Sequence, residues 1–156
     1  MALQDIFQVD HSELVFETSP SGENVVLGKG SFSTVVKATY NKQPVAVKIF
    51  KTDSFVNSEE FRNEILILSA VKHPCILPLV GVTKPPNVAV VTPYIENGSL
   101  FDFLHKNKLD EAKYTWRVLL KVAFDIASGM TFFDIRAELT LLTCIHLFSY
   151  ALFAYI

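Results

Sequence analysis

One stretch of the chain, residues 26–48, limits the possible folds more than any other, because it sets a glycine turn among β-type runs. It reads VLGKGSFSTVVKATYNKQPVAVK. Gly28 and Gly30 have no Cβ, so a ligand can approach their backbone N–H groups closely. The polar residues 41–44 separate two β-branched runs and predict a hairpin. Lys48 ends an apolar run, and a half-buried ammonium there needs an anionic partner.

These residues resemble the ATP-binding half of a protein kinase. The family's loop reads G-x-G-x-x-G-x-V, and its third strand carries V-A-x-K. Here the loop is GKGSFSTV and the strand VAVK, with Ser33 in place of the third glycine. A lone G-x-G would fit an ordinary hairpin turn, whereas the loop and the strand motif together are far more specific. The resemblance implies that ATP is bound by Leu27, Gly28, Lys29, Gly30, Ser31, Phe32, Ser33, Val35, Ala46 and Lys48.

A helix is expected to follow, with Asn57 as N-cap and Glu60 three residues later in a capping-box pattern. An apolar stripe with helical spacing faces a core; it consists of Phe61, Ile65 and Leu68. Glu64 lies beside this stripe. By the resemblance it pairs with Lys48 and holds that lysine at the α- and β-phosphates. The alternative is a solvated carboxylate without a special role.

The segment TPYIENGSL, which starts at Thr92, resembles the hinge between the two kinase lobes. The resemblance places Thr92 behind the adenine as gatekeeper and gives the adenine two backbone contacts, the Pro93 carbonyl and the Ile95 N–H. Proline lacks only its N–H, so both contacts are available. Ser99 and Asp102 fall where the family reaches the ribose. Their alternative roles are a helix cap and a first-turn carboxylate favoured by the helix dipole.

Further along, apolar runs predict strands at residues 76–82 and 88–92, and residues 14–16 fit a short edge strand. His73 is interpreted as structural. A long helix is expected over residues 114–133. Its pattern W-x(6)-A-x-D-I-A-x-G-M resembles the E-helix of the tyrosine-kinase-like group, the kinases related to Raf and to the plant receptor-like enzymes. Asp125 and Gly129 belong to this pattern and are expected to be structural.

The resemblance covers about residues 14–133 and implies an α+β fold. We expect a protein-kinase-like N-lobe, with a five-stranded antiparallel sheet and one packed helix, followed by a truncated helical C-lobe. The expected parts are an N-terminal lead-in (1–13), the N-lobe (14–92), a hinge (93–98), partial C-lobe helices (99–136) and a hydrophobic tail (137–156). Leu68 and Leu79 would supply the two upper members of the family's regulatory spine.

The motifs H-R-D-x-x-x-x-N, D-F-G and A-P-E, which the family places downstream, do not occur in the sequence. The acids after the long pattern, Asp134 and Glu138, stand in no such context. The catalytic aspartate and the ligands of the two magnesium ions are therefore missing. The family activity is ATP-dependent phosphorylation of proteins in signal transduction. Ser or Thr is favoured over Tyr as the acceptor, but the segments that decide between them are missing from the sequence. This chain alone is expected to bind ATP weakly and to be inactive. The alternative is a non-catalytic, kinase-like fragment that binds protein partners.

Residues 139–156, LTLLTCIHLFSYALFAYI, contain no Asp, Glu, Lys or Arg. Eighteen such residues meet the lower length limit for a membrane helix. Three interpretations stay open: a terminus from an altered reading frame or retained intron, a membrane anchor, and a helix that covers exposed apolar surface. His146 counts against the anchor, because polar groups in hydrocarbon are costly.

Net charge, cysteine pattern and the N-terminal sequence limit the expected partners, metal sites and location. The net charge of −2 gives no reason to expect nucleic acid as a partner. Cys75 and Cys144 match no metal or disulfide pattern and are expected to be reduced, buried thiols. Residues 1–13 lack the basic start and apolar run of a signal peptide. The expected location is the cytoplasm, with membrane association through residues 139–156 as the alternative.

Overall fold

The computed structural model describes residues 8–30, 33–51, 59–100 and 115–136. The chain divides into two compact units, the first made of residues 1–71 and 78–94 and the second of residues 72–77 and 95–156. The first unit holds a twisted sheet and one helix, and the second holds a long helix with the short segment 72–77.

The sheet is centred on a hairpin of two eight-residue strands, β4 (Ser33–Tyr40) and β5 (Gln43–Phe50). Their connecting residues, Asn41 and Lys42, have φ values of 48° and 63°, and Tyr40 pairs with Gln43 across them. Two positive φ angles define the primed turn whose twist matches that of paired strands. The predicted hairpin is confirmed.

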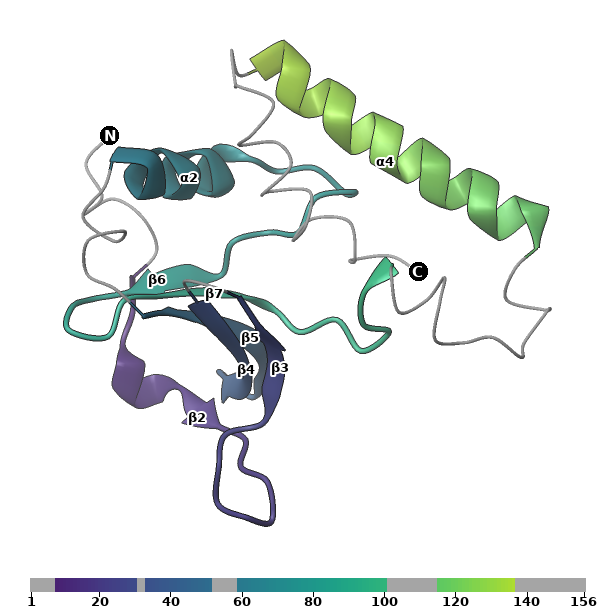
Figure 1. Cartoon of the computed structure of the whole chain (residues 1–156). Helices are drawn as coiled ribbons and strands as arrows, with labels where there is room; N and C mark the ends of the chain where they lie inside the picture. The colour runs from purple at the N-terminus through teal and green to yellow at the C-terminus, as the bar shows by residue number, and fades with distance from the viewer. Residues whose placement is uncertain (1–7, 31–32, 52–58, 101–114, 137–156) are drawn as a thin grey trace. The chain divides into compact units, whose positions relative to one another are not determined.

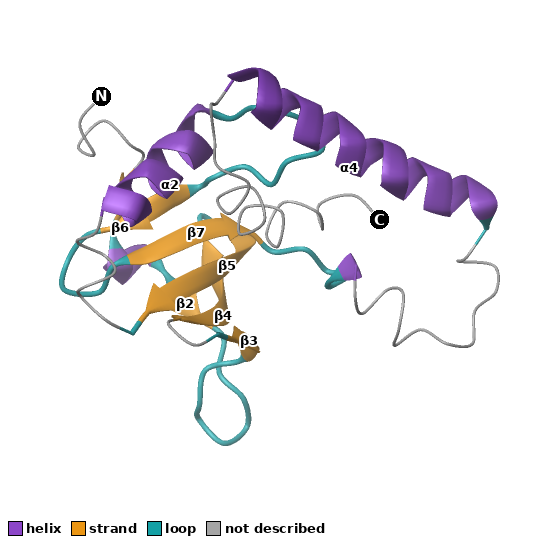
Figure 2. Ribbon diagram, turned by 45° about the horizontal axis from the view of Figure 1, so that its top comes forward, coloured by secondary structure: helices purple, strands orange, loops and turns teal. Residues whose placement is uncertain are grey.

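Around this hairpin the strands follow the order β1-β6-β7-β5-β4-β2, and β3 also pairs with β4. Figure 2 shows β6, β7 and β5 side by side. The other strands are β1 (Gln8–Val9), β2 (Val15–Phe16), β3 (Val26–Lys29), β6 (Gly81–Thr83) and β7 (Ala89–Pro93). Strands β3 to β7 pair antiparallel, as expected, and the α+β class is confirmed. Two short strands extend the expected five: β2, the predicted edge strand, and β1, which lies parallel to β6.

Two expectations for this sheet were wrong in detail. Residues 8–13, expected to be a lead-in outside the sheet, contribute strand β1 with the buried Val9 and a 3-10 helix, His11–Glu13. Asp10 caps this helix by accepting the Ser12 N–H at 2.9 Å. The strand expected from residue 76 starts only at Gly81. Pro78, which has no N–H to donate to a ladder, lies in the part that is not strand.

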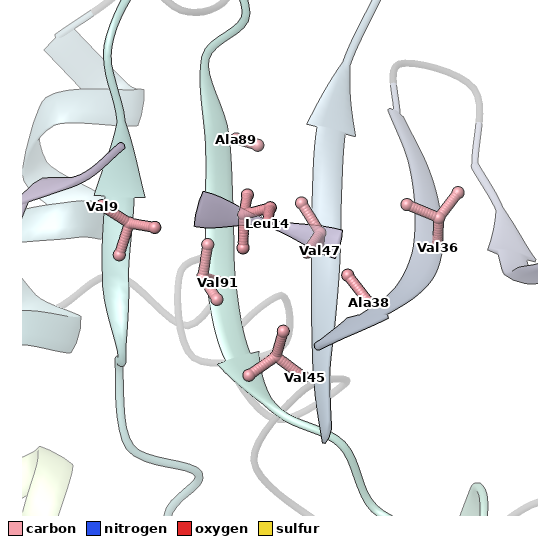
Figure 3. Packing of buried hydrophobic residues seen from close by; sticks show 8 residues of the cluster. All are labelled: Val9, Leu14, Val36, Ala38, Val45, Val47, Ala89 and Val91. Atoms are coloured by element: carbon pink, nitrogen blue, oxygen red, sulfur yellow. The ribbon is translucent and has the colours of Figure 1, made fainter. Parts of the chain in front are cut away.

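The core covers one face of the sheet. Its eight buried side chains are apolar and come mostly from alternate positions of β4, β5 and β7 (Figure 3): Val9, Leu14, Val36, Ala38, Val45, Val47, Ala89 and Val91. Register pairs Val36 with Val47 and Val47 with Val91. Since successive side chains of a strand point to opposite faces, the residues between these positions form the other face.

Helix α2 (Glu59–Ala70) covers part of that other face (Figure 1). Phe61 and Ile65, exposed by 3% and 0%, pack with Val90 of β7. Leu68 is also buried, so the predicted apolar stripe is confirmed. Leu79, the other expected spine residue, is partly buried against the same cluster. The predicted cap residue Asn57 lies outside the described residues.

In the second unit, α4 (Trp116–Arg136) confirms the predicted long helix with slightly later bounds. Asp125 accepts hydrogen bonds from the Lys121 ammonium at 2.5 Å and from the Cys75 thiol at 3.7 Å. Gly129 is buried, and a Cβ there would meet the Cys75 carbonyl at 3.5 Å, an ordinary contact. These bonds agree with the structural role expected for Asp125, whereas the expected role of Gly129 stays a prediction.

Cys75 is partly buried and is a free cysteine. Burial, and next the charge of Asp125, raise the pKa of its thiol, so the thiol stays protonated. The Cys75 N–H donates to Nδ1 of His73 at 3.1 Å, while Nε2 of His73 lies 3.4 Å from the Ser128 hydroxyl. His73 therefore joins the segment 72–77 to α4, which agrees with a structural role. Cys144 lies outside the described residues.

Apolar side chains also lie on the exposed side of α4: Trp116, Leu120 and Phe124 are exposed by 79%, 64% and 72%. Their four-residue spacing places them in one stripe. Within the described ranges, no helix is long and apolar enough to cross a membrane. Residues 139–156 are not among those ranges, so the three interpretations of the tail stay predictions.

Candidate functional site

Four of the predicted nucleotide-binding residues share the sheet face opposite the core. Val35 of β4 pairs with Lys48 of β5, and Ala46 pairs with Thr92 of β7. Directly paired residues point to the same side of a sheet, and so do residues two apart on one strand. The register therefore brings Val35, Ala46, Lys48 and Thr92 onto a single surface, which we call the site face.

The glycine turn joins this face at its β3 edge. Leu27, Gly28 and Lys29 belong to β3, and a register shift between Val26 and Gly28 sets Gly28 opposite Val35. A Cβ added at Gly28 would meet nothing within 4 Å, and Gly28 does not have a positive φ. Among the described residues, neither its backbone conformation nor a close neighbour explains the glycine. The open space fits a ligand that approaches the backbone closely.

The turn after β3 closes on the start of β4. The Gly30 N–H donates to the Ser33 carbonyl at 2.8 Å, and the Lys51 ammonium donates to the Gly30 carbonyl at 3.0 Å. Ser33, at the third glycine position, is buried and starts β4 without a positive φ. A Cβ at this position is therefore accommodated. The predicted site residues Ser31 and Phe32 lie outside the described residues.

Lys48 is half-buried, and its Nζ lies 5.0 Å from the centre of the Phe50 ring. That ring meets Phe61 of α2 edge-on, with centroids 5.0 Å apart. In register, Lys48 also faces Val90, which packs against α2. Lys48 thus lies next to the helix that carries Glu64. The Glu64 side chain is outside the described part, so its ion pair with Lys48 stays a prediction.

The expected hinge begins where β7 ends. Pro93 is the last residue of β7, and the next N–H, that of Tyr94, donates to the Pro44 carbonyl at 3.1 Å. Ile95 belongs to the second unit, where its carbonyl accepts the Gly98 N–H at 3.3 Å. Ser99 also lies in that unit, and Asp102 lies outside the described residues. The adenine and ribose contacts of these residues stay predictions.

Sequence reasoning missed Lys37, which shares the site face because it pairs with Ala46. Its ammonium is held by Glu17 at 2.8 Å and lies 4.8 Å from the centre of the Tyr94 ring. A lysine in a strand is normally assigned to solvent. The signal that could have placed Lys37 is its two-residue spacing from Val35, which sets both side chains on one face.

Comparison with known proteins identifies the family of the chain that carries this site face. The family model "Protein tyrosine and serine/threonine kinase" matches residues 23–146, which is more than half of the chain. The chain belongs to the protein kinase family. The match begins before β3 and so includes the glycine turn and the site face.

Several curated kinases are similar to this kinase-family chain. A probable serine/threonine-protein kinase of Dictyostelium discoideum is 40% identical over 110 residues, 68% of this chain and 12% of that protein. From Arabidopsis thaliana, serine/threonine-protein kinase CTR1 is 39% identical over 117 residues, 70% of this chain and 14% of CTR1. STY17, also a serine/threonine-protein kinase of that plant, is 34% identical over 132 residues, 82% of this chain and 21% of STY17. The kinase chain thus spans about a fifth or less of these relatives.

Kinases use magnesium with ATP, and the family's magnesium ligands can be sought in this chain. The family's ligands are the D-F-G aspartate and the catalytic-loop asparagine, and neither motif occurs in the sequence. Among the described residues, no group of three or more His, Cys, Asp or Glu side chains could hold a metal ion. The residues predicted to bind ATP are better represented among the described residues, because the site face and β3 both lie there.

Proposed function

We propose that this chain is the ATP-binding part of a serine/threonine protein kinase of the tyrosine-kinase-like, Raf-related group. The observation that carries the proposal is the strand register, which sets Val35, Ala46, Lys48 and Thr92 on one face beside the glycine turn. The nucleotide would lie on this face. The signalling role and the protein substrates of the whole kinase follow from the family only and are part of the proposal.

Each group on the site face suits one part of ATP. Val35 and Ala46 offer apolar contact to the flat adenine ring, and Thr92 lies on the same face. The family resemblance adds the Pro93 carbonyl and the Ile95 N–H as the expected contacts of the adenine edge. The Lys48 ammonium and the N–H groups of the glycine turn suit the phosphates. Glu64 would hold Lys48 in place, and Ser99 and Asp102 would reach the ribose. ATP is held without the metal that normally bridges its phosphates, so binding is weak.

We further propose that these 156 residues do not transfer phosphate by themselves. The family's catalytic aspartate accepts the substrate proton, and its magnesium ions neutralise the charge that develops on the transferred group. The motifs for both are missing from the sequence. Catalysis of this reaction consists of positioning and electrostatic stabilisation, so half of the site does not give half of the rate.

Nucleotide binding tests the proposal directly. In a titration of the full chain with a fluorescent ATP analogue, we expect a dissociation constant of about 0.1–1 mM. Lys48→Met removes the charge nearest the phosphates and should weaken binding about 10- to 100-fold, since a bond to a charged group contributes about 1.5–3 kcal/mol. Glu64→Gln should weaken it about threefold, which corresponds to about 0.65 kcal/mol.

The matched control is Lys42→Met, at the turn end of the same hairpin, where the lysine is exposed. It removes the same charge far from the glycine turn and should leave the dissociation constant unchanged. Equal binding by the wild-type chain and Lys48→Met would show that the nucleotide does not use the site face.

A second candidate function is a non-catalytic interaction fragment, anchored to a membrane by residues 139–156. The exposed apolar stripe of α4 and the uncharged tail both favour it. If the tail is an anchor, deletion of residues 139–156 should move the chain from the membrane fraction to the soluble fraction of cells. A distribution that the deletion leaves unchanged would contradict the anchor.

A further inference from the structure

Lys51 makes a contact with the glycine turn that the kinase motifs do not describe. It is the first residue after β5, and its ammonium donates to the Gly30 carbonyl at 3.0 Å across 21 positions of sequence. The reason for this proximity is the strand register. The last pair of the β4–β5 hairpin joins Ser33 and Phe50, so the residue after Phe50 emerges beside the base of the turn.

Two hydrogen bonds now hold the backbone of Gly30, and we call this pair of bonds the clamp. The Gly30 N–H already donates to the Ser33 carbonyl at 2.8 Å, and the Lys51 ammonium binds the Gly30 carbonyl. Both backbone polar groups of Gly30 are therefore fixed.

Such a clamp reduces the entropy that a glycine turn loses when it binds a ligand. Glycine loses more conformational freedom on ordering than any other residue, and this turn contains two glycines. A turn that is already ordered binds its ligand with a smaller entropy loss. The lysine contributes a charge-assisted hydrogen bond, which is stronger than a neutral one. Lys51 itself is exposed, so the expected effect on affinity is moderate.

We propose that Lys51 is a positioning residue, which holds the glycine turn in the geometry that receives the nucleotide by binding the Gly30 carbonyl. The effect on nucleotide affinity rests on the proposed function, whereas the effect on the turn does not. Lys51 acts through Gly30 and is distinct from Lys48, whose partner would be the phosphate itself.

The first experiment measures the turn without any nucleotide. Amide hydrogen exchange of Gly30 is followed by NMR in the full chain and in Lys51→Met, Lys51→Arg and Lys42→Met. We expect exchange about fivefold faster in Lys51→Met, because loss of the carbonyl anchor also loosens the bond from Gly30 to Ser33. Lys51→Arg keeps a cationic donor and should restore slow exchange, while Lys42→Met should match the wild-type chain. Identical Gly30 exchange in Lys51→Met and the wild-type chain would overturn the proposal.

The second experiment repeats the titration with the fluorescent ATP analogue on the same proteins. Lys51→Met should bind about three- to tenfold more weakly, as expected for the loss of one hydrogen bond of about 1 kcal/mol. Lys51→Arg should recover most of the affinity. Unchanged affinity in Lys51→Met, with wild-type binding present, would overturn the positioning role. Absence of nucleotide binding in every protein, with Gly30 exchange still dependent on Lys51, would overturn the proposed function and still support the clamp.

Discussion

No transfer of the γ-phosphate to a protein substrate above background is the expected result when the 156-residue chain is incubated with ATP and magnesium or manganese. The groups of this chain that are predicted to bind the nucleotide are Lys48, the N–H groups of the glycine turn and the hinge. The motifs in which the family carries its catalytic base and its magnesium ligands do not occur in the given sequence. Loss of a single well-placed electrostatic contact already costs about 100- to 1,000-fold in rate. Several such losses together remove measurable turnover.

The assay uses labelled ATP and a generic protein substrate, with Lys48→Met as the control. Both proteins should give the same background signal. Transfer by the wild-type chain that is lost in Lys48→Met would contradict the expectation, and an acid of this chain would then have to act as the base. Asp125 is a weak candidate, because Lys121 and the Cys75 thiol already bind its carboxylate. Asp134→Asn would therefore be tested first.

Local patterns were enough to predict the centre of the fold. The alternation of β4 and β5 and the polar turn between them determine the hairpin, since Asn tolerates a positive φ and period-two alternation sets the register. The spacing of Phe61, Ile65 and Leu68 likewise determined which face of α2 is buried. These features depend on residues that are close in sequence.

Contacts between distant residues were missed for a physical reason. Gln8 pairs with Val82 in a strand of only two residues, which is too short to show any periodicity. The bond from Lys51 to Gly30 depends on how far the β4–β5 ladder extends, and Ser33, a substitution in the family motif, starts that ladder. Neither contact can be inferred from residue type alone.

The sequence predicted several residues of the candidate site, but it did not predict all of the residues that lie beside them. The motif placed Val35, Ala46 and Lys48 together, and the register agrees with one shared face. Lys37 was missed because its charge suggests solvent, although Glu17 and Tyr94 hold its ammonium beside the same face. The Glu64 side chain and the residues at the tip of the turn lie outside the described part, so their roles rest on the sequence.

Replacement of Ile65 by alanine is expected to lower the free energy of unfolding by about 3 kcal/mol, within the usual range of 2–5 kcal/mol for this truncation. Ile65 is 0% exposed and packs with Phe61 of its own helix and Val90 of β7. Truncation removes buried apolar surface and leaves a cavity between α2 and the sheet. The measurement is urea unfolding of the full chain, followed by far-ultraviolet circular dichroism.

Leu120→Ala is the matched control, because it makes a similar truncation on a helix at a side chain that is 64% exposed. Alanine is a good helix former, so this change should alter the unfolding free energy by less than about 0.5 kcal/mol. Equal losses in the two variants would contradict the packing of α2 on Val90. Because α2 also carries Glu64, the cavity should let the helix shift away from Lys48. Ile65→Ala should therefore also weaken binding of the ATP analogue under conditions where the chain is still folded, whereas Leu120→Ala should not.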